Sequence, residues 1–479
     1  MRYAIWDLET NSSDTFFGFI LEAGGILVDE NFKELDRFNL RGRLPEGELF
    51  QSMALLVNGT SIKQLTQVNL SHYELIDQIE KIFQKWGREG STIFLGWSNI
   101  GFDDEMLRKE FFRGLRYPYL LNSSPNKRHD GLNIARAAYG IDPNILKVEL
   151  NHKSNPVFKL ESLSRMQGFD TSTSHTAFTD ASNTARILGL IKNKQPENWD
   201  SFFKTSSKIE TETIVKSHDL LTLSEFFYGR VHNYLIIPLH KNHCIHPIYK
   251  WALAIDVKSD IEALMNMSIN ELKAQMKKVP KFLRTIRSNK GPILLDPKFA
   301  KQEKPYNEMS FEEIDKKIKL VKENEKLSQN ILIAVKEIAE DKKQSESQEE
   351  IYPEEDIYNN FSPKKDQLLF PEWHTANWQD KLRLIPKFED TRLHWFAQKM
   401  IYQEAPEVLP EDLRKSIKRK IAKRILSKAN EKWITIGQLY SEIDMLRDKY
   451  DDENDKEKLK QLDEHDQFAK TVEQKYENA

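Results

Sequence analysis

The sequence predicts an α/β fold with a mixed sheet, followed by a second region of strands and long charged helices and by a helical region at the end. Strand-like and helix-like segments alternate over about the first 190 residues, which is typical of layered α/β folds. The pattern then changes near Pro196. A charged stretch of low hydrophobicity, Glu340–Asp356, precedes the last region and is typical of a linker.

The first region contains short apolar runs separated by turn-forming residues. We expect strands at Tyr3–Leu8, in the segments beginning at Gly18 and Glu34, and at Ser91–Trp97. Apolar residues at helical spacing predict helices over Asn69–Trp86, Phe102–Phe112, Leu160–Met166 and Asp180–Leu190. Such alternation favours a sheet covered by helices.

The later regions divide at polar or charged segments. Strands are expected in the YLIIPLH and KWALAIDV segments, and helices at 267–278 and 310–340. Beyond residue 357 helix-forming residues dominate, with prolines in the first half of that region. The predicted domains are therefore 1–195, 196–345 and 357–479, with a linker at 346–356.

Composition limits the class of protein. The 479 residues are 39% hydrophobic and 30% charged, with a net charge of −3, so overall charge does not indicate nucleic-acid binding. Cys244 is the only cysteine, which excludes an internal disulfide. No apolar run approaches the about 20 residues of a membrane span, and the start lacks a signal-peptide pattern. We expect a soluble, cytoplasmic protein.

Asp7 and Glu9 end the first predicted strand. Residues two apart in a strand share a face, so their carboxylates are close and repel each other. A divalent cation between them relieves this repulsion, and oxygen ligands suit Mg²⁺ or Mn²⁺. The Asp-x-Glu pattern recurs elsewhere, for example at Asp103 and Glu105, and alone it also fits a surface pair. Its position after an apolar strand, where ligands bind in open α/β sheets, favours a metal site.

Two further segments supply acids and a histidine. Asp103 and Asp104 open a predicted helix, where acids also occur because they favour the helix dipole. His175 and Asp180 are five residues apart, or roughly 140° around a helix, so they can meet only if His175 lies on the preceding loop. His72 matches the same spacing with Asp77, inside an amphipathic segment that we interpret as a solvated helix face.

The combination of these motifs, in this order, resembles the DEDD family of 3′→5′ exonucleases, and His175 places it in the DEDDh subgroup. Three segments narrow the resemblance to the bacterial exonuclease I family: residues 99–119 (NIGFDDEMLRKEFFRGLRYPY), 158–169 (FKLESLSRMQGF) and 356–366 (DIYNNFSPKKD). The resemblance implies a ribonuclease H-like exonuclease domain, an SH3-like α+β domain and a helical C-terminal domain.

The same resemblance implies a processive 3′→5′ exonuclease that degrades single-stranded DNA to 5′-mononucleotides in DNA repair and recombination. Two Mg²⁺ ions, about 3.5–4 Å apart and replaceable by Mn²⁺, would clamp the scissile phosphate. By this resemblance the metal ligands are Asp7, Glu9, Asp103 and Asp180, with Asp103 preferred to Asp104 because it directly follows Phe102. His175 would be the general base, since the ordinary pKa of histidine near 6.5 suits proton transfer at neutral pH.

Substrate contacts are expected beyond the metal site. We expect them at Glu9, Lys159, Arg108, Tyr119 and Phe158. The resemblance implies Lys159, which replaces an arginine of the family, and Phe158 beside it also fits a core position. Arg108 and Tyr119 belong to the stretch that follows Asp103. Basic residues interleaved with aromatic rings after Asp103 suit a single strand, because cations follow phosphates and rings stack on bases. The segment Ala54–Ser61 resembles the one that wedges near the 3′-terminal nucleotide.

Two basic stretches, Lys273–Lys290 and Arg414–Lys432, could follow the strand or bind the acidic tail of single-stranded DNA-binding protein, or could be solvated helix faces. We expect a monomer.

Two alternative functions remain open from the sequence. One is an exoribonuclease, because the motifs do not read the 2′-hydroxyl. The other is a non-catalytic nucleic-acid-binding module, against which the complete acid set argues.

Overall fold

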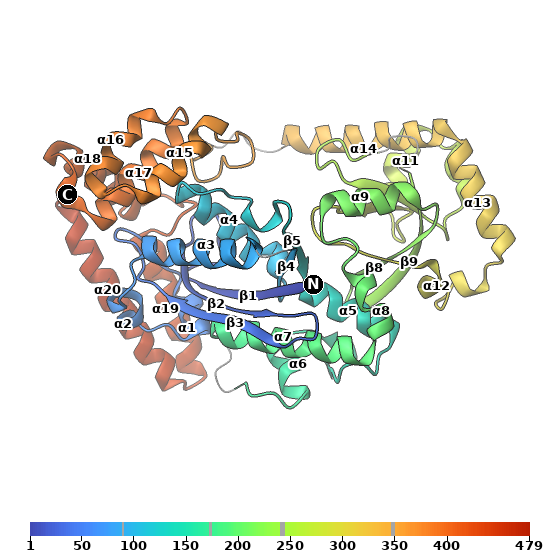
Figure 1. The fold of residues 1–479 in the computed structure, drawn as a ribbon, viewed down its shortest axis with the longest axis horizontal. Helices are drawn as coiled ribbons and strands as arrows, with labels where there is room; N and C mark the ends of the chain where they lie inside the picture. The colour runs from blue at the N-terminus through green and yellow to red at the C-terminus, as the bar shows by residue number, and fades with distance from the viewer. Residues whose placement is uncertain (89–90, 172–174, 240–244, 346–349) are drawn as a thin grey trace.

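The computed structural model describes residues 1–88, 91–171, 175–239, 245–345 and 350–479, without the side chains of residues 344 and 345. Cys244 lies outside these residues. Figure 1 shows a central sheet from the start of the chain, a smaller sheet with its helices on one side, and the C-terminal helices on the other.

The first sheet is mixed, as expected, and has the order β3-β2-β1-β4-β5. Strand β1 is antiparallel to β2 and parallel to β4, and β4 is parallel to β5. The strands are β1 (Arg2–Thr10), β2 (Ile20–Val28), β3 (Glu34–Arg41), β4 (Thr92–Gly96) and β5 (Lys127–Asp130). Alternate side chains of β1 therefore face opposite layers.

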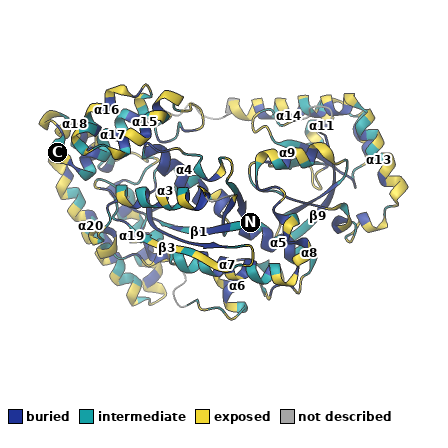
Figure 2. Ribbon diagram, in the orientation of Figure 1, coloured by how far each residue is buried: buried dark blue, intermediate teal, exposed yellow. Residues whose placement is uncertain are grey.

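Helices cover both faces of this sheet. They are α1 (Ser52–Asn58), α2 (Ile62–Gln67), α3 (His72–Arg88), α4 (Asp103–Arg113), α5 (Gly131–Ile141), α6 (Leu160–Met166) and α7 (Ala177–Lys194), with a short hairpin of β6 (Glu149–Leu150) and β7 (Pro156–Val157) before α6. Ala4 and Trp6 of β1 pack against α3 and α4. Tyr3 and Ile5 point the other way, toward α5 and α7. Figure 2 shows the resulting buried core between the layers.

The second sheet is antiparallel and has the order β11-β10-β9-β8-β12. Its strands are β8 (Leu221–Phe227), β9 (Arg230–Pro238), β10 (Ala252–Asp256), β11 (Leu283–Ile286) and β12 (Ile293–Leu295). The helices of this region are α8 (Pro196–Phe202), α9 (Lys208–Ser217), α10 (Ile261–Asn266), α11 (Ile269–Lys277), α12 (Pro297–Ala300), α13 (Phe311–Glu323) and α14 (Glu325–Ser345). Trp199 of α8 donates to the Tyr3 hydroxyl at 2.8 Å, so packing against the first sheet continues past residue 195.

The helix expected at 310–340 is in fact two helices, and this expectation was wrong. Asn324 separates α13 from α14, and its Oδ1 accepts a hydrogen bond at 2.8 Å from the Leu327 amide. An asparagine side chain that caps free amides in this way starts a new helix. Helix α14 also extends into the charged stretch that begins at Glu340.

The C-terminal region is helical: among the described residues, no strand follows β12. Its helices are α15 (Lys364–Thr375), α16 (Trp378–Leu384), α17 (Thr391–Glu404), α18 (Glu411–Ile425), α19 (Ile436–Asp452) and α20 (Lys456–Glu477). Their core includes Leu21 and Phe112 of the first region, so the two regions share apolar surface. Within the predicted linker, Glu354 is buried and pairs with Arg424 at 2.6 Å, which attaches this segment to α18.

The described helices include none that is both long enough and apolar enough to cross a bilayer.

Candidate active site

Asp7 and Glu9 lie at the C-terminal end of β1, on the face that is covered by α7. Strand alternation puts them on the same side as Tyr3 and Ile5, as the sequence predicted. Glu9 is directly opposite Glu22 of β2 in the antiparallel register. The two predicted ligands therefore lie together at an end of the sheet.

Asp180 reaches them because α7 begins directly above β2. It lies in the first turn of α7, and one oxygen each of Asp7, Glu9 and Asp180 lie within 4.8 Å of one another. Gly24 of β2 permits this approach, because a Cβ there would be 2.2 Å from the Phe178 amide nitrogen. A larger residue would push the start of the helix away from the sheet.

The two acids at the start of α4 have different surroundings. Asp103 is 6% exposed, accepts a hydrogen bond from the Leu8 amide, and is close enough to Asp7 to raise its pKa. Asp104 forms an ion pair with Arg128 and lies 3.4 Å from the Asn99 side-chain amide. Since Asp104 already has a cationic partner, the geometry favours Asp103 as the fourth metal ligand.

The four carboxylates destabilise one another as anions. Burial, and then the neighbouring acids, raise the pKa of Asp7 well above its ordinary value and that of Glu9 to about 9. Burial and Asp104 raise the pKa of Asp103 to about 8. Burial raises the pKa of Asp180 to about 6 even though His175 lowers it. Among the described residues, none of the four forms an ion pair with Lys or Arg. Such a set of oxygen donors fits a divalent cation.

His175 precedes α7 on the loop, as the spacing predicted, and Asp180 is on the helix. Its backbone has a φ of 68°, and its amide donates to the Asp180 carboxylate. The ring is 48% exposed, and its Nε2 lies 3.8 Å from an oxygen of Glu161. The imidazole therefore lies open to solvent at the edge of the acid cluster.

Two acids near the site were not predicted. Glu22 is 3% exposed, pairs with Arg41 and accepts a hydrogen bond from the Ala177 amide at 3.2 Å, so it ties α7 to β2. Asp130 ends β5 and caps α5, and burial raises its pKa to about 6. A single acid inside the apolar run ILEAGGILV was the available signal for Glu22.

The expected substrate contacts lie in different environments. Arg108 is 8% exposed, and its guanidinium lies 5.3 Å from the Tyr119 ring centre. Phe158 is 6% exposed and packs edge-on against Tyr139 and Phe226, which is a core environment. Lys159 is exposed at the start of α6. The segment Ala54–Ser61 spans the end of α1, where Asn58 donates to the Thr10 carbonyl at 3.1 Å beside the acids.

A groove of about 780 Å³ runs along the second sheet beside α5, which packs against β8 and β9. Its lining combines basic and aromatic side chains: Arg136, Phe226, Phe227, Tyr228, Tyr234, Lys258, Lys281, Arg284, Arg287 and Lys290. Four of these cations belong to the first basic stretch of the sequence. Lys273 of that stretch instead faces Glu337 of α14 at 3.0 Å. Most of the second stretch lies in α18, whose Ile417 and Ile421 are buried and whose cations are mostly exposed.

The comparisons with known proteins agree with this geometry. The family model "Exonuclease I C-terminal domain" matches residues 352–472. Over nearly the whole chain (98%) the fold superposes on 99% of Escherichia coli exonuclease I in complex with a dA16 oligonucleotide, with a TM-score of 0.81 and 19% identity. A solved ExoI/SSB-Ct complex has a TM-score of 0.78, again with 19% identity and the same coverage. These matches confirm the expected fold class.

Sequence relatives extend the match. An exodeoxyribonuclease I of Buchnera aphidicola (Schizaphis graminum) is 26% identical over 416 residues, which are 82% of this chain and 81% of the relative. Another, from Buchnera aphidicola (Acyrthosiphon pisum), is 30% identical over 292 residues, or 58% of this chain and 68% of the relative. With that identity and coverage, the chain belongs to the exodeoxyribonuclease I family.

Proposed function

We propose that this protein is a divalent-metal-dependent 3′→5′ exonuclease that degrades single-stranded DNA processively to 5′-mononucleotides. The observation that carries the proposal is the cluster of half-buried carboxylates formed by Asp7, Glu9 and Asp180, beside the buried Asp103, in a chain of the exodeoxyribonuclease I family. Single-stranded DNA as substrate rests on the relatives' names and on the oligonucleotide-bound structural neighbour.

The four acids would hold two divalent ions, Mg²⁺ being the hard cation that their oxygen atoms suit. Bound there, the ions supply a lowered pKa for an attacking water and charge stabilisation for the leaving 3′-oxygen. The protein fixes the ligands from three elements: β1 for Asp7 and Glu9, α4 for Asp103 and α7 for Asp180. Because these elements pack against one another, the four carboxylates are held together before substrate arrives.

His175 would accept the proton of the attacking water. Its position just before α7 puts the imidazole next to Asp180, and its exposure allows the proton to leave to solvent. The hydrogen bond from its own amide to Asp180 holds the loop against the helix start. His175 would therefore pass the proton from the acid cluster to bulk solvent.

The groove that runs along the second sheet beside α5 would carry the strand. Its arginines and lysines can follow phosphates, and Phe227 and Tyr228 at the tip of the β8–β9 hairpin are exposed and can stack on bases. Lys290 connects this groove to the start of α4, since its Nζ lies 3.5 Å from Glu105. The groove thus leads toward Asp103.

We also propose single-stranded DNA-binding protein as a partner, because a neighbouring fold is solved as an ExoI/SSB-Ct complex. An acidic tail would require exposed cations, and α18 presents Arg414, Arg419, Lys420 and Lys423. A cytoplasmic role in DNA repair and recombination is proposed on family membership alone.

The test uses single-stranded DNA labelled at its 5′ end, with Mg²⁺ or with EDTA. We expect a ladder that shortens from the 3′ end, and no digestion with EDTA or with Asp7→Ala. A matched RNA measures the exoribonuclease alternative, and equal or faster RNA digestion would replace the proposed substrate. Absence of digestion with both Mg²⁺ and Mn²⁺ would overturn the enzyme proposal.

A further inference from the structure

The first turn of α1 is capped by a side chain from the C-terminal region. Glu442 of α19 accepts hydrogen bonds from the backbone amides of Ser52 at 2.7 Å and Met53 at 3.4 Å. These are the first two amides of α1, and a helix offers no partner of its own to such amides. A carboxylate at this end also interacts favourably with the helix dipole. The C-terminal region therefore completes a helix of the first region.

The residue that precedes α1 has a different role. Gln51, at the N-cap position, makes no side-chain hydrogen bond to the helix. Its Oε1 instead accepts from the amide of Ser13 at 2.9 Å and from the hydroxyl of Ser13 at 3.1 Å. The backbone amide of Gln51 donates to the Asn11 carbonyl at 2.9 Å. Gln51 thus ties the start of α1 to the chain that follows Glu9, and the cap is supplied by Glu442.

The other end of α1 lies beside the metal site. Asn58, the last residue of the helix, donates to the Thr10 carbonyl at 3.1 Å, and Thr10 directly follows Glu9 in β1. Asn58 is 6% exposed, so water competes little for this bond. The Oδ1 of Asn58 accepts from the Thr60 amide at 3.1 Å, so both polar ends of its side chain are bonded. A shift of α1 would therefore move the end of β1.

A second series of contacts connects the end of α1 to α7. The Thr60 hydroxyl accepts a hydrogen bond from Arg41 at 2.9 Å. Arg41 forms an ion pair with Glu22 of β2. Glu22 accepts a hydrogen bond from the Ala177 amide at 3.2 Å, in the helix turn that carries Asp180. Both series of contacts therefore begin at α1 and end beside a proposed metal ligand.

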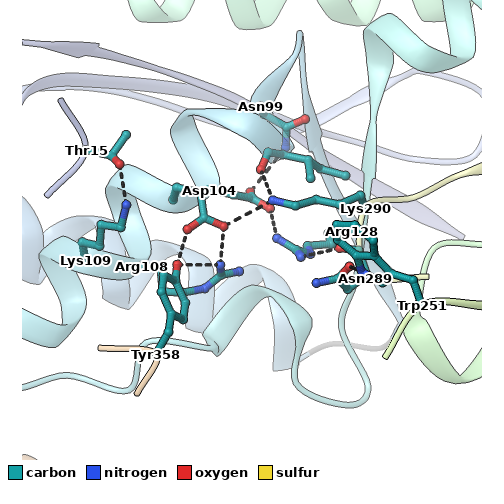
Figure 3. Close-up of polar contacts among 12 residues, drawn as sticks. Thr15, Asn99, Asp104, Arg108, Lys109, Arg128, Trp251, Asn289, Lys290 and Tyr358 are labelled. Carbon is teal, nitrogen blue, oxygen red and sulfur yellow. Dashed lines mark hydrogen bonds and ion pairs between the residues drawn. The ribbon is translucent and has the colours of Figure 1, made fainter. Parts of the chain in front are cut away.

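The chain that follows β1 is also held by α4. Lys109 of α4 donates a hydrogen bond to the Thr15 hydroxyl (Figure 3). Arg113, one turn further along, donates to the Phe16 carbonyl at 2.8 Å. Helix α4 also carries Asp103 at its start. Two helices thus fix the chain next to the acid cluster, and one of them, α1, depends on a cap from the C-terminal region.

We propose that Glu442 is a positioning residue for cleavage: by capping α1, it holds the end of β1 and the start of α7 in the arrangement that the metal site requires. This inference rests on the proposed exonuclease function. Leu55 and Leu56 of α1 pack in the same apolar core as α19, but apolar contacts have no preferred direction. Hydrogen bonds to two successive amides do have one, so the cap fixes the orientation of the helix.

The expected effect is on the rate of cleavage and not on binding of the strand. Among the described residues that line the groove beside α5, none belongs to α1 or α19. Loss of the cap should therefore leave the contacts in the groove unchanged. It should disturb the acid cluster, because the two series of contacts that begin at α1 end there.

The experiment compares the full-length protein with Glu442→Ala and with Glu442→Gln, which keeps one acceptor oxygen. It measures removal of the first 3′ nucleotide from single-stranded DNA in a single turnover, with protein in excess and Mg²⁺ present. We expect the rate of Glu442→Ala to fall about fivefold, which corresponds to about 1 kcal/mol, the usual effect of removing a helix cap. Glu442→Gln should recover most of the rate. The Kd for the strand, measured by fluorescence anisotropy in EDTA, should remain that of the wild type.

Two further variants separate this role from general destabilisation. Asp444→Ala removes an exposed acid of the same helix, which pairs with Arg447 at 3.6 Å, and should change neither the rate nor the Kd. Asn58→Ala breaks the contact with Thr10, and combining it with Glu442→Ala should give no further fall, because both act through α1. Additive effects would overturn the inference, as would an unchanged rate or a rise in Kd that matches the fall in rate.

A measurement without DNA distinguishes failure of this inference from failure of the proposed function. We expect faster hydrogen–deuterium exchange in residues 52–58 of Glu442→Ala, and not of Asp444→Ala, because the first amides of α1 lose their acceptor. If the wild-type protein digests no DNA but this exchange rises, the function is wrong and the cap stands. If the exchange is unchanged, the inference is overturned whether or not the protein digests DNA.

Discussion

Neutralising Glu9 should make the metal-free protein more stable at alkaline pH. The folded pKa of Glu9 is raised from 4.5 to about 9, first by burial and then by Asp180, Glu22 and Asp103. A raised pKa means that the protonated form stabilises the folded chain fully below pH 4.5. This stability is lost as the pH rises toward 9, because the folded protein must then hold the anion. Glu9→Gln removes this loss.

The magnitude follows from the linkage relation. Between pH 6 and pH 8 the wild-type protein should lose about 2.7 kcal/mol through Glu9 alone, at about 1.36 kcal/mol for each pH unit. For a chain of 479 residues, with an unfolding entropy of about 2.1 cal/mol/K per residue, this corresponds to a Tm change of about 3 °C. The Tm of Glu9→Gln relative to wild type should rise by that amount.

The assay is thermal unfolding by intrinsic fluorescence at pH 6, 7 and 8, in EDTA and in Mg²⁺. Mg²⁺ should raise the Tm of the wild-type protein, and more strongly at pH 8, because fewer protons then compete for the carboxylates. Mg²⁺ should raise the Tm of Glu9→Gln far less, because one carboxylate ligand is missing. Glu407→Gln, at an exposed position, is the matched control. Parallel Tm curves for wild type and Glu9→Gln in EDTA would refute the electrostatic reasoning.

Three further predictions concern the surroundings of the site. Asp103→Asn should abolish the rise in Tm that Mg²⁺ causes. Asp104→Asn should keep this rise but lower the free energy of unfolding by about 3–5 kcal/mol, because Arg128 loses its partner in a buried site. If a Mg²⁺ titration gives the reverse result, Asp104 and not Asp103 is the metal ligand. Gly24→Ala should lower the free energy of unfolding by about 1–3 kcal/mol and weaken Mg²⁺ binding, since the new Cβ would displace Phe178 and the start of α7. Gly101→Ala is the control, because a Cβ there would meet no atom within 4 Å. Equal effects of the two substitutions would argue against the close approach of α7 to Gly24. Burial lowers the pKa of His129 to about 4, so the stability that its neutral ring provides above pH 6.5 is lost on acidification, by about 2 kcal/mol at pH 5. Urea unfolding of His129→Asn should not show this loss. If the variant has the same dependence of stability on pH as the wild type, the burial of His129 is not its cause.

The sequence determined most of the local structure of the site. Leu160–Met166 was predicted with the bounds that the structure shows, and β1 and α3 within a few residues. The break at Asn324 was missed because the charged residues on both sides have the same helical pattern. Periodicity reports amphipathic spacing and does not detect a cap within it.

The choice between Asp103 and Asp104 shows what local pattern lacks. Both begin α4, and residue spacing alone gives them equal standing as ligands. Their surroundings in the structure differ, because Arg128 of β5 pairs with Asp104, whereas Asp103 lies close enough to Asp7 to raise its pKa; Asp103 is therefore the ligand that we propose. Glu22 joins the site through its register opposite Glu9 and through its hydrogen bond from the Ala177 amide. Neither fact is encoded in the spacing of neighbouring residues.

The sequence by itself determined that Asp7 and Glu9 share a face of one strand. It also placed His175 on a loop and Asp180 on the helix that follows. Both conclusions concern directions within one element, which strand and helix periodicities fix. The tertiary structure decided that Asp180 reaches Asp7, with Gly24 allowing α7 to rest on β2, and that Glu442 caps α1. Such meetings depend on how distant segments pack, since burial and charge pairing act between elements and not along the chain.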